Sequence, residues 1–126
     1  MKEEIPGLIE YTEAKALHAK WLDTRGEIIA NALGHEESYE INFSANDLLK
    51  YLEYVIESSK EQGIDEPGIR ILFGTYDEDK NPSLEKLRTK ATVVLVPTVE
   101  SSADSSCNKT INALNRAHTG WPPIGL

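Results

Sequence analysis

The sequence predicts an α+β fold in which a small mixed or antiparallel sheet of about three strands packs against two to three helices. Residues 9–25 and 45–62 repeat apolar side chains at spacings of three to five, as in a helix that buries one face. Residues 69–76 and 91–97 are short apolar runs, which is typical of strands covered on both sides. Because the order is helix, strand, helix, strand, strand, the helices are expected to form a layer on the sheet.

The first helix is predicted over residues 9–25, with an apolar stripe that includes Ile9, Leu17 and Trp21. Gly26 follows and lowers helix stability by about 1 kcal/mol relative to alanine. Either the helix continues through this glycine or a second short helix starts over residues 27–33. Gly34 is predicted to end the helix, because glycine readily adopts the left-handed conformation found just after a helix.

A short strand is predicted over residues 38–43, where apolar and polar side chains alternate. Ser44 follows, with Asp47 three residues later, a near match to the capping box that starts helices. The next helix is therefore predicted from residue 45 to residue 62, and Gly63 is expected to end it.

The two apolar strands, 69–76 and 91–97, are expected to pair as a wide hairpin. The helices carry enough apolar side chains to cover one face of the sheet. The period of two places Arg70, Leu72 and Tyr76 on the other face. An apolar face without a second helical layer favours a partner, which could be another copy of the chain.

The composition predicts one α+β domain over residues 1–99. From residue 100 the chain becomes rich in serine and aspartate and loses its apolar period. Residues 100–126 are therefore predicted to be a flexible linker and an apolar C-terminal tail. The tail includes Trp121, Pro122 and Pro123, which are candidates for contacting a partner protein.

The charge balance argues against anionic partners. The 126-residue chain carries 21 acidic and 13 basic residues, a net charge of −8. Such a chain repels phosphate backbones and anionic lipids, so neither nucleic acid nor a membrane is expected as a partner. The N-terminus does not show a basic start followed by an apolar segment, and Cys107 is the single cysteine. Both features favour a cytoplasmic location.

The strand Gly68-Ile69-Arg70-Ile71-Leu72-Phe73-Gly74 and the helix before it resemble a family of short bacterial proteins of uncharacterised function. The resemblance covers most of residues 9–99 and includes the pair Glu13-Ala14 in the first helix and Pro122-Pro123 in the tail. In that family cysteines often flank the two prolines, whereas this chain has Trp121 and Ile124 there. The resemblance implies a compact fold and brings no activity with it.

Arg70 is the residue that most needs an explanation, because arginine is rarely buried without a partner. Its planar guanidinium suits a carboxylate or a phosphate, and Tyr76 would share its face of the strand. Two interpretations stay open. Arg70 forms an internal ion pair or hydrogen bonds to carbonyl groups, or Arg70 and Tyr76 recognise a ligand. His18 is a further candidate, either packed against Trp21 or acting as a general base at a pocket rim.

The remaining patterns predict no metal site and no cofactor. The three histidines lack metal-ligand spacing, and Cys107 lies in the predicted linker, where it would be an incidental exposed thiol. Residues 77–88 begin like a calcium loop. However, Pro82 stands where that loop needs glycine, and Arg88 stands where it needs glutamate. The chain therefore contains no convincing catalytic set, and we expect a role other than catalysis.

Three functional hypotheses follow from the sequence. The leading one is a small cytoplasmic protein-interaction domain that associates with itself. The second is a small-molecule anion-binding protein or enzyme that uses Arg70 and Tyr76. The third is an acidic inhibitor of a basic protein, for which salt-sensitive binding would be the sign.

Overall fold

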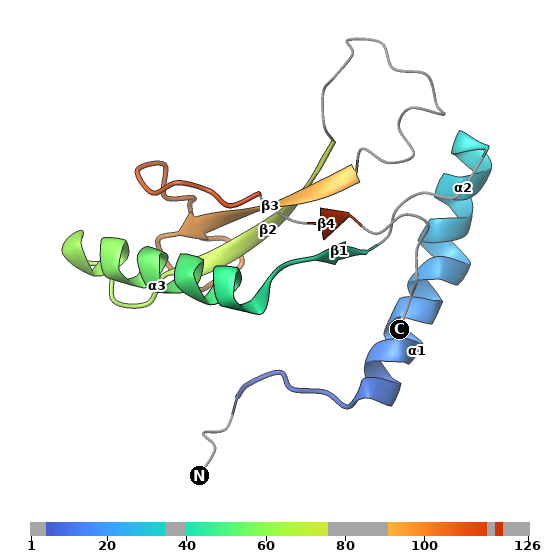
Figure 1. The fold of residues 1–126 in the computed structure, drawn as a ribbon, viewed down its shortest axis with the longest axis horizontal. Coiled ribbons are helices and arrows are strands. Elements are labelled where there is room, and N and C mark those ends of the chain that lie inside the picture. The colour runs from blue at the N-terminus through green and yellow to red at the C-terminus, as the bar shows by residue number, and fades with distance from the viewer. Residues whose placement is uncertain (1–4, 35–39, 76–90, 116–117, 120–126) are drawn as a thin grey trace.

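The computed structural model describes residues 5–34, 40–75, 91–115 and 118–119, and its class is α+β, as predicted (Figure 1). The strands form two antiparallel two-stranded sheets, one of β1 with β4 and one of β2 with β3. In chain order the elements are α1 (Tyr11–Trp21), the π-helical turn η1 (Leu22–Gly26), α2 (Glu27–Leu33), β1 (Ile41–Asn42), α3 (Ala45–Glu61), β2 (Gly68–Thr75), β3 (Ala91–Thr98) and β4 (His118–Thr119).

The predicted antiparallel pairing of the two long strands is confirmed. Gly68 of β2 lies opposite Thr98 of β3, and the register continues without a break to Thr75 opposite Ala91. The expected first strand is shorter than predicted and belongs to the other sheet, because Ile41 pairs with Thr119 of β4. Pairing between segments so far apart in the chain leaves no local signal in the sequence.

Helix α3 covers one face of the β2–β3 hairpin (Figure 1). Its start is the predicted one, because the Ser44 hydroxyl accepts a hydrogen bond from the Asp47 N–H at 3.2 Å. Gly63, with a φ of +77°, follows its C-terminal end as predicted. The core joins the inner side of α3 to β3 and to one residue of the C-terminal segment, and its buried apolar members are Tyr51, Val55, Val93, Leu95 and Ile111.

The segment after β3 differs from the predicted flexible linker. Leu114 and Leu95 exchange two backbone hydrogen bonds of 2.8 and 2.9 Å, and the Asn108 N–H donates to the Pro97 carbonyl. Ile111 is 5% exposed and belongs to the core. The polar composition suggested that a linker starts at residue 100. However, backbone hydrogen bonds and the buried side chain of Ile111 attach residues 105–114 to the domain. The predicted boundary at residue 99 therefore does not separate this segment from the domain.

The N-terminal helices form one continuous helical arm over residues 11–33, so the helix continues through Gly26. Gly26 is buried against Trp21, and a Cβ there would lie 3.2 Å from the indole ring. A π-helical turn holds more residues than an α-helical turn, which rotates the helix after it. In the helix that follows, Ile29 is half-buried, whereas Ile28 is 68% exposed. Gly34 ends α2 with a φ of +80°, as predicted.

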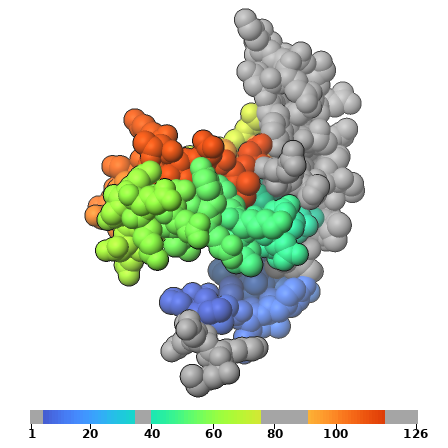
Figure 2. Space-filling model, turned by 60° about the vertical axis from the view of Figure 1, so that its left-hand side comes forward, coloured from blue at the N-terminus to red at the C-terminus, as the bar shows by residue number. Residues whose placement is uncertain are grey.

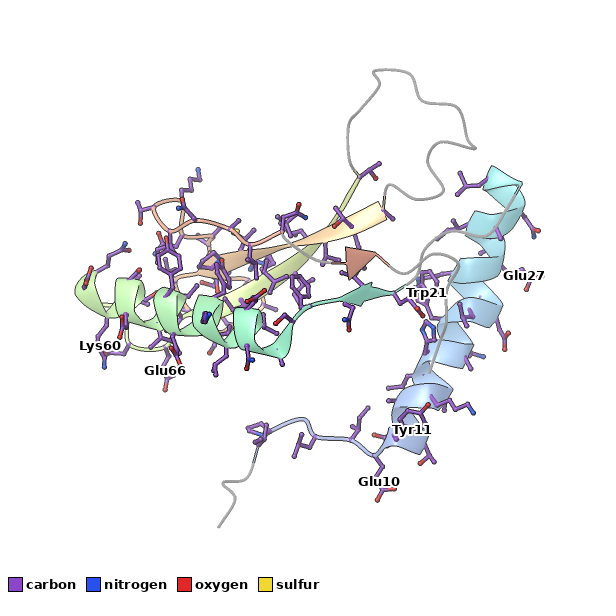
Figure 3. The ribbon with its side chains drawn as sticks, in the orientation of Figure 1. Glu10, Tyr11, Trp21, Glu27, Lys60 and Glu66 are labelled. Atoms are coloured by element: carbon purple, nitrogen blue, oxygen red, sulfur yellow. The ribbon has the colours of Figure 1, made fainter. Side chains whose placement is uncertain are left out.

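The helical arm stands beside the rest of the domain in Figure 1. Figure 2 shows α3 (green) and the C-terminal segment (orange) as one continuous mass, with the N-terminal residues (blue) beneath it. In Figure 3, Trp21 lies on the side of the arm that faces this mass, and Glu27 lies on the outer side. None of the helices in the described ranges is both long enough and apolar enough to cross a membrane.

Candidate interaction surface

Arg70 holds the loop that follows β3. Its Nη2 donates to the carbonyl of Ala103 at 2.9 Å and to that of Ser105 at 2.6 Å. Its Nη1 donates to the Cys107 sulfur at 3.4 Å. The guanidinium therefore has internal partners of the kind that one of the two sequence interpretations expected, namely carbonyl groups.

Of the other predicted site residues, the structure describes only His18, and it does not bring His18 to Arg70. His18 is half-buried in α1, on the helical arm that stands apart from β2 (Figure 1). Tyr76 and the tail residues Trp121, Pro122 and Pro123 lie outside the described residues. Over the described ranges, no group of three or more histidine, cysteine, aspartate and glutamate side chains could hold a metal ion.

The direction of the backbone groups in β3 can be read from its partners. Leu95 exchanges both backbone bonds with Leu114, so its N–H and C=O point away from β2. Successive residues of a strand point these groups to opposite sides, so those of Val94 and Val96 point toward β2. Their partners in the register are Leu72 and Arg70, whose backbone groups therefore complete the β2–β3 ladder.

The other residues of β2 direct their backbone groups away from β3. Ile69, Ile71, Phe73 and Thr75 alternate with the ladder residues, so their N–H and C=O groups form the outer edge of β2. Within the part of the chain that the structure describes, no backbone hydrogen bond reaches this edge. We call these four residues the β2 edge.

The opposite edge of the sheet is occupied. Besides the bonds of Leu95, the Val99 N–H donates to Ser106 at 3.0 Å, and Asn115 Nδ2 donates to the Val93 carbonyl at 2.9 Å. The C-terminal segment thus satisfies the outer backbone groups of β3. The β2 edge has no such cover among the described residues.

The side chains near the β2 edge are unusually apolar for exposed positions. Phe73 is 92% exposed, Ile71 is 62% exposed and Leu72 is 43% exposed. Proteins normally protect a free edge with lysine, proline, inward charges or a bulge. β2 contains no lysine, acidic residue or proline, and its one charged group, on Arg70, is bound to the loop. These features make the β2 edge the best candidate for a functional surface.

An acidic groove lies at the end of the hairpin where β2 begins. It has a volume of about 740 Å³ and is lined by residues 63–66 and 99–102. Three of its lining residues, Asp65, Glu66 and Glu100, are acidic, and none of them has an ion-pair partner within the described ranges. Figure 3 shows Glu66 near the end of α3 marked by Lys60.

The loop that forms one wall of this groove is fixed by several polar contacts. Thr98 Oγ1 donates to the Glu100 carbonyl at 2.6 Å, and the Glu100 N–H donates to Ser105 Oγ at 2.8 Å. Gly68 allows the close approach of this loop, because a Cβ there would clash with Thr98 Oγ1 and lie 2.8 Å from the Glu100 oxygen. Two residues of the Gly-Ile-Arg sequence therefore position this loop: Gly68 leaves space for it, and Arg70 forms hydrogen bonds to it.

A scan of protein-family models, a search of curated proteins and a search of solved structures each found no match to this chain. The resemblance to short bacterial proteins stays a prediction.

Sequence reasoning assigned no role to the acidic residues of the groove. Asp65 and Glu66 read as part of a turn, and Glu100 read as the start of a linker. For the β2 edge, the sequence did contain a signal: the apolar run of the strand has no charged residue besides Arg70 that could protect an exposed edge. That signal suggests a covered strand, but it does not say whether this chain or a partner supplies the cover.

Proposed function

We propose that this protein is a protein-interaction domain, acting in the cytoplasm, that binds an extended segment of a partner as an added strand on the β2 edge. The observation that carries the proposal is that no described residue pairs with the outer edge of β2, which lies beside the exposed side chains of Ile71 and Phe73. In this mode of recognition, backbone hydrogen bonds supply affinity and alternate side chains supply specificity.

The anion-binding and enzymatic alternatives have less support. The guanidinium of Arg70 already donates to two carbonyl oxygens and a sulfur. His18, the other described candidate, lies in the separate helical arm. An incoming anion would have to displace the loop at residues 103–107 before it could bind Arg70 through the same nitrogen atoms.

A second copy of the chain is one occupant that fits the edge. In an antiparallel pair centred on Ile71, each Phe73 would lie opposite Ile69 of the other copy, and all these residues point their backbone groups outward. Self-association, as expected from the sequence, is therefore compatible with the proposal. A strand from a different protein is the other possible occupant.

Fluorescence anisotropy with a labelled peptide tests the proposal. The probe is an uncharged strand former, Thr-Val-Thr-Val-Thr-Val, and Phe73→Lys places a charge beside the edge. We expect this substitution to weaken binding about tenfold or more, because a charge blocks strand addition. Ile56→Lys is the matched control, since Ile56 is an exposed apolar residue of α3. Equal binding by the Phe73→Lys variant and the unsubstituted protein would show that β2 is not the site.

A further inference from the structure

We infer that the strand accepted by the β2 edge runs antiparallel to β2 and carries basic residues at its C-terminal end, which enter the acidic groove. This inference rests on the proposed function and adds the direction and the charge of the partner.

The groove lies at the end of the hairpin toward which such a strand would run. Residues 63–66 come just before Gly68, and residues 99–102 come just after Thr98, which is the register partner of Gly68. Antiparallel pairing is the more stable arrangement per residue and the one that β2 already makes with β3, so we take the added strand to run from the Thr75 end toward the Gly68 end. Because a strand advances about 3.4 Å per residue, its next two or three residues would reach the level of Asp65 and Glu66.

Charge complementarity selects a basic C-terminal end. The residues that line the groove, 63–66 and 99–102, include three acidic residues and no lysine or arginine. The hydroxyl groups of Ser101 and Ser102 add acceptors. The whole chain has a net charge of −8, so its field also attracts a cationic segment.

The same argument disfavours a second copy of this chain as the occupant. In an antiparallel pair centred on Ile71, Thr75 of one copy would lie opposite residue 67 of the other copy, at the groove end of its β2, and the sequence that follows Thr75 starts there. That sequence is Tyr76-Asp77-Glu78-Asp79, which is acidic. Like charges would therefore meet at both ends of a β2–β2 pair, whereas a basic partner would bring opposite charges together.

Two labelled peptides of identical composition test the direction and the charge. One is Thr-Val-Thr-Val-Thr-Val-Gly-Lys-Lys-Arg, and the other carries Lys-Lys-Arg-Gly before the same strand. The measurement is anisotropy at about 0.15 M ionic strength, where general attraction beyond about 8 Å is screened. We expect the peptide with the C-terminal basic end to bind about tenfold more tightly.

A pair of double variants locates the charged contact. Glu66→Gln with Glu100→Gln removes two groove carboxylates and should abolish the tenfold preference. Glu10→Gln with Glu27→Gln, at one exposed position just before the helical arm and one within it, changes the net charge equally and should leave the preference intact (Figure 3).

The outcomes separate this inference from the proposed function. Equal binding of both basic peptides, or a preference that survives Glu66→Gln with Glu100→Gln, would overturn the inference while strand addition on β2 stands. Binding of the basic peptide that Phe73→Lys does not weaken would overturn both. A dimer that Phe73→Lys dissociates, together with no binding of either peptide, would identify a second copy as the occupant and overturn the inference.

Discussion

Replacing Arg70 with methionine should release the loop that forms one wall of the acidic groove. Methionine keeps an apolar stem of similar length but removes the donors to Ala103, Ser105 and Cys107. A hydrogen bond from a charged donor contributes about 1.5–3 kcal/mol. The bond to Ala103 is exposed and counts for little, whereas the bond to Ser105 is partly buried. We therefore expect a loss of about 2 kcal/mol in the free energy of unfolding.

Urea denaturation followed by far-ultraviolet circular dichroism measures this change. Arg25→Met is the matched control, because Arg25 is exposed in η1 and has no partner within the described ranges. It should change the free energy of unfolding by less than about 0.5 kcal/mol. Arg70→Lys should fall between the two, since lysine can reach one carbonyl but cannot fork between two. Equal stabilities of Arg70→Met and Arg25→Met would refute the clamping role of Arg70.

Three further predictions concern the core. Ile111→Ala should lower the free energy of unfolding by about 3 kcal/mol because Ile111 is a buried core residue. An unchanged urea midpoint would show that the C-terminal segment is not part of the core. Ser59→Ala should stabilise the protein by about 1 kcal/mol, since the Ser59 hydroxyl is buried and has no hydrogen-bond partner within the described ranges; a lower melting temperature would contradict this. Burial, with a smaller effect of Tyr54, raises the pKa of Tyr51 from 10.0 to about 12. The unfolded chain therefore loses this proton first, so the contribution of Tyr51 to stability should be constant below pH 10 and fall between about pH 10 and pH 12. Urea titrations should show a shallower fall over that range in Tyr51→Phe.

The elements predicted well from the sequence are those with local causes. The cap formed by Ser44 and Asp47, and the helix ends at Gly34 and Gly63, depend on residues within one turn of each other. The antiparallel pairing of the two long strands was also predicted correctly, because both runs are apolar and follow each other in the chain.

The features that the sequence did not reveal depend on contacts between distant segments. Residues 105–114 look like a linker by composition, yet their backbone groups extend the sheet and Ile111 fills the core. The partners of Arg70 lie more than 30 positions away in the chain. The unbroken apolar run also suggested that β2 is covered on both sides, whereas Phe73 is 92% exposed.

Amide hydrogen exchange along β2, measured by NMR with and without the basic peptide, tests the central claim most directly. In the free protein, the amides of Ile69, Ile71 and Phe73 should exchange about tenfold or more faster than those of Arg70 and Leu72, which bond to β3. The peptide should slow the first group and leave the second unchanged. Uniform protection of all five amides in the free, monomeric protein would show that the β2 edge is already covered, and would contradict the account.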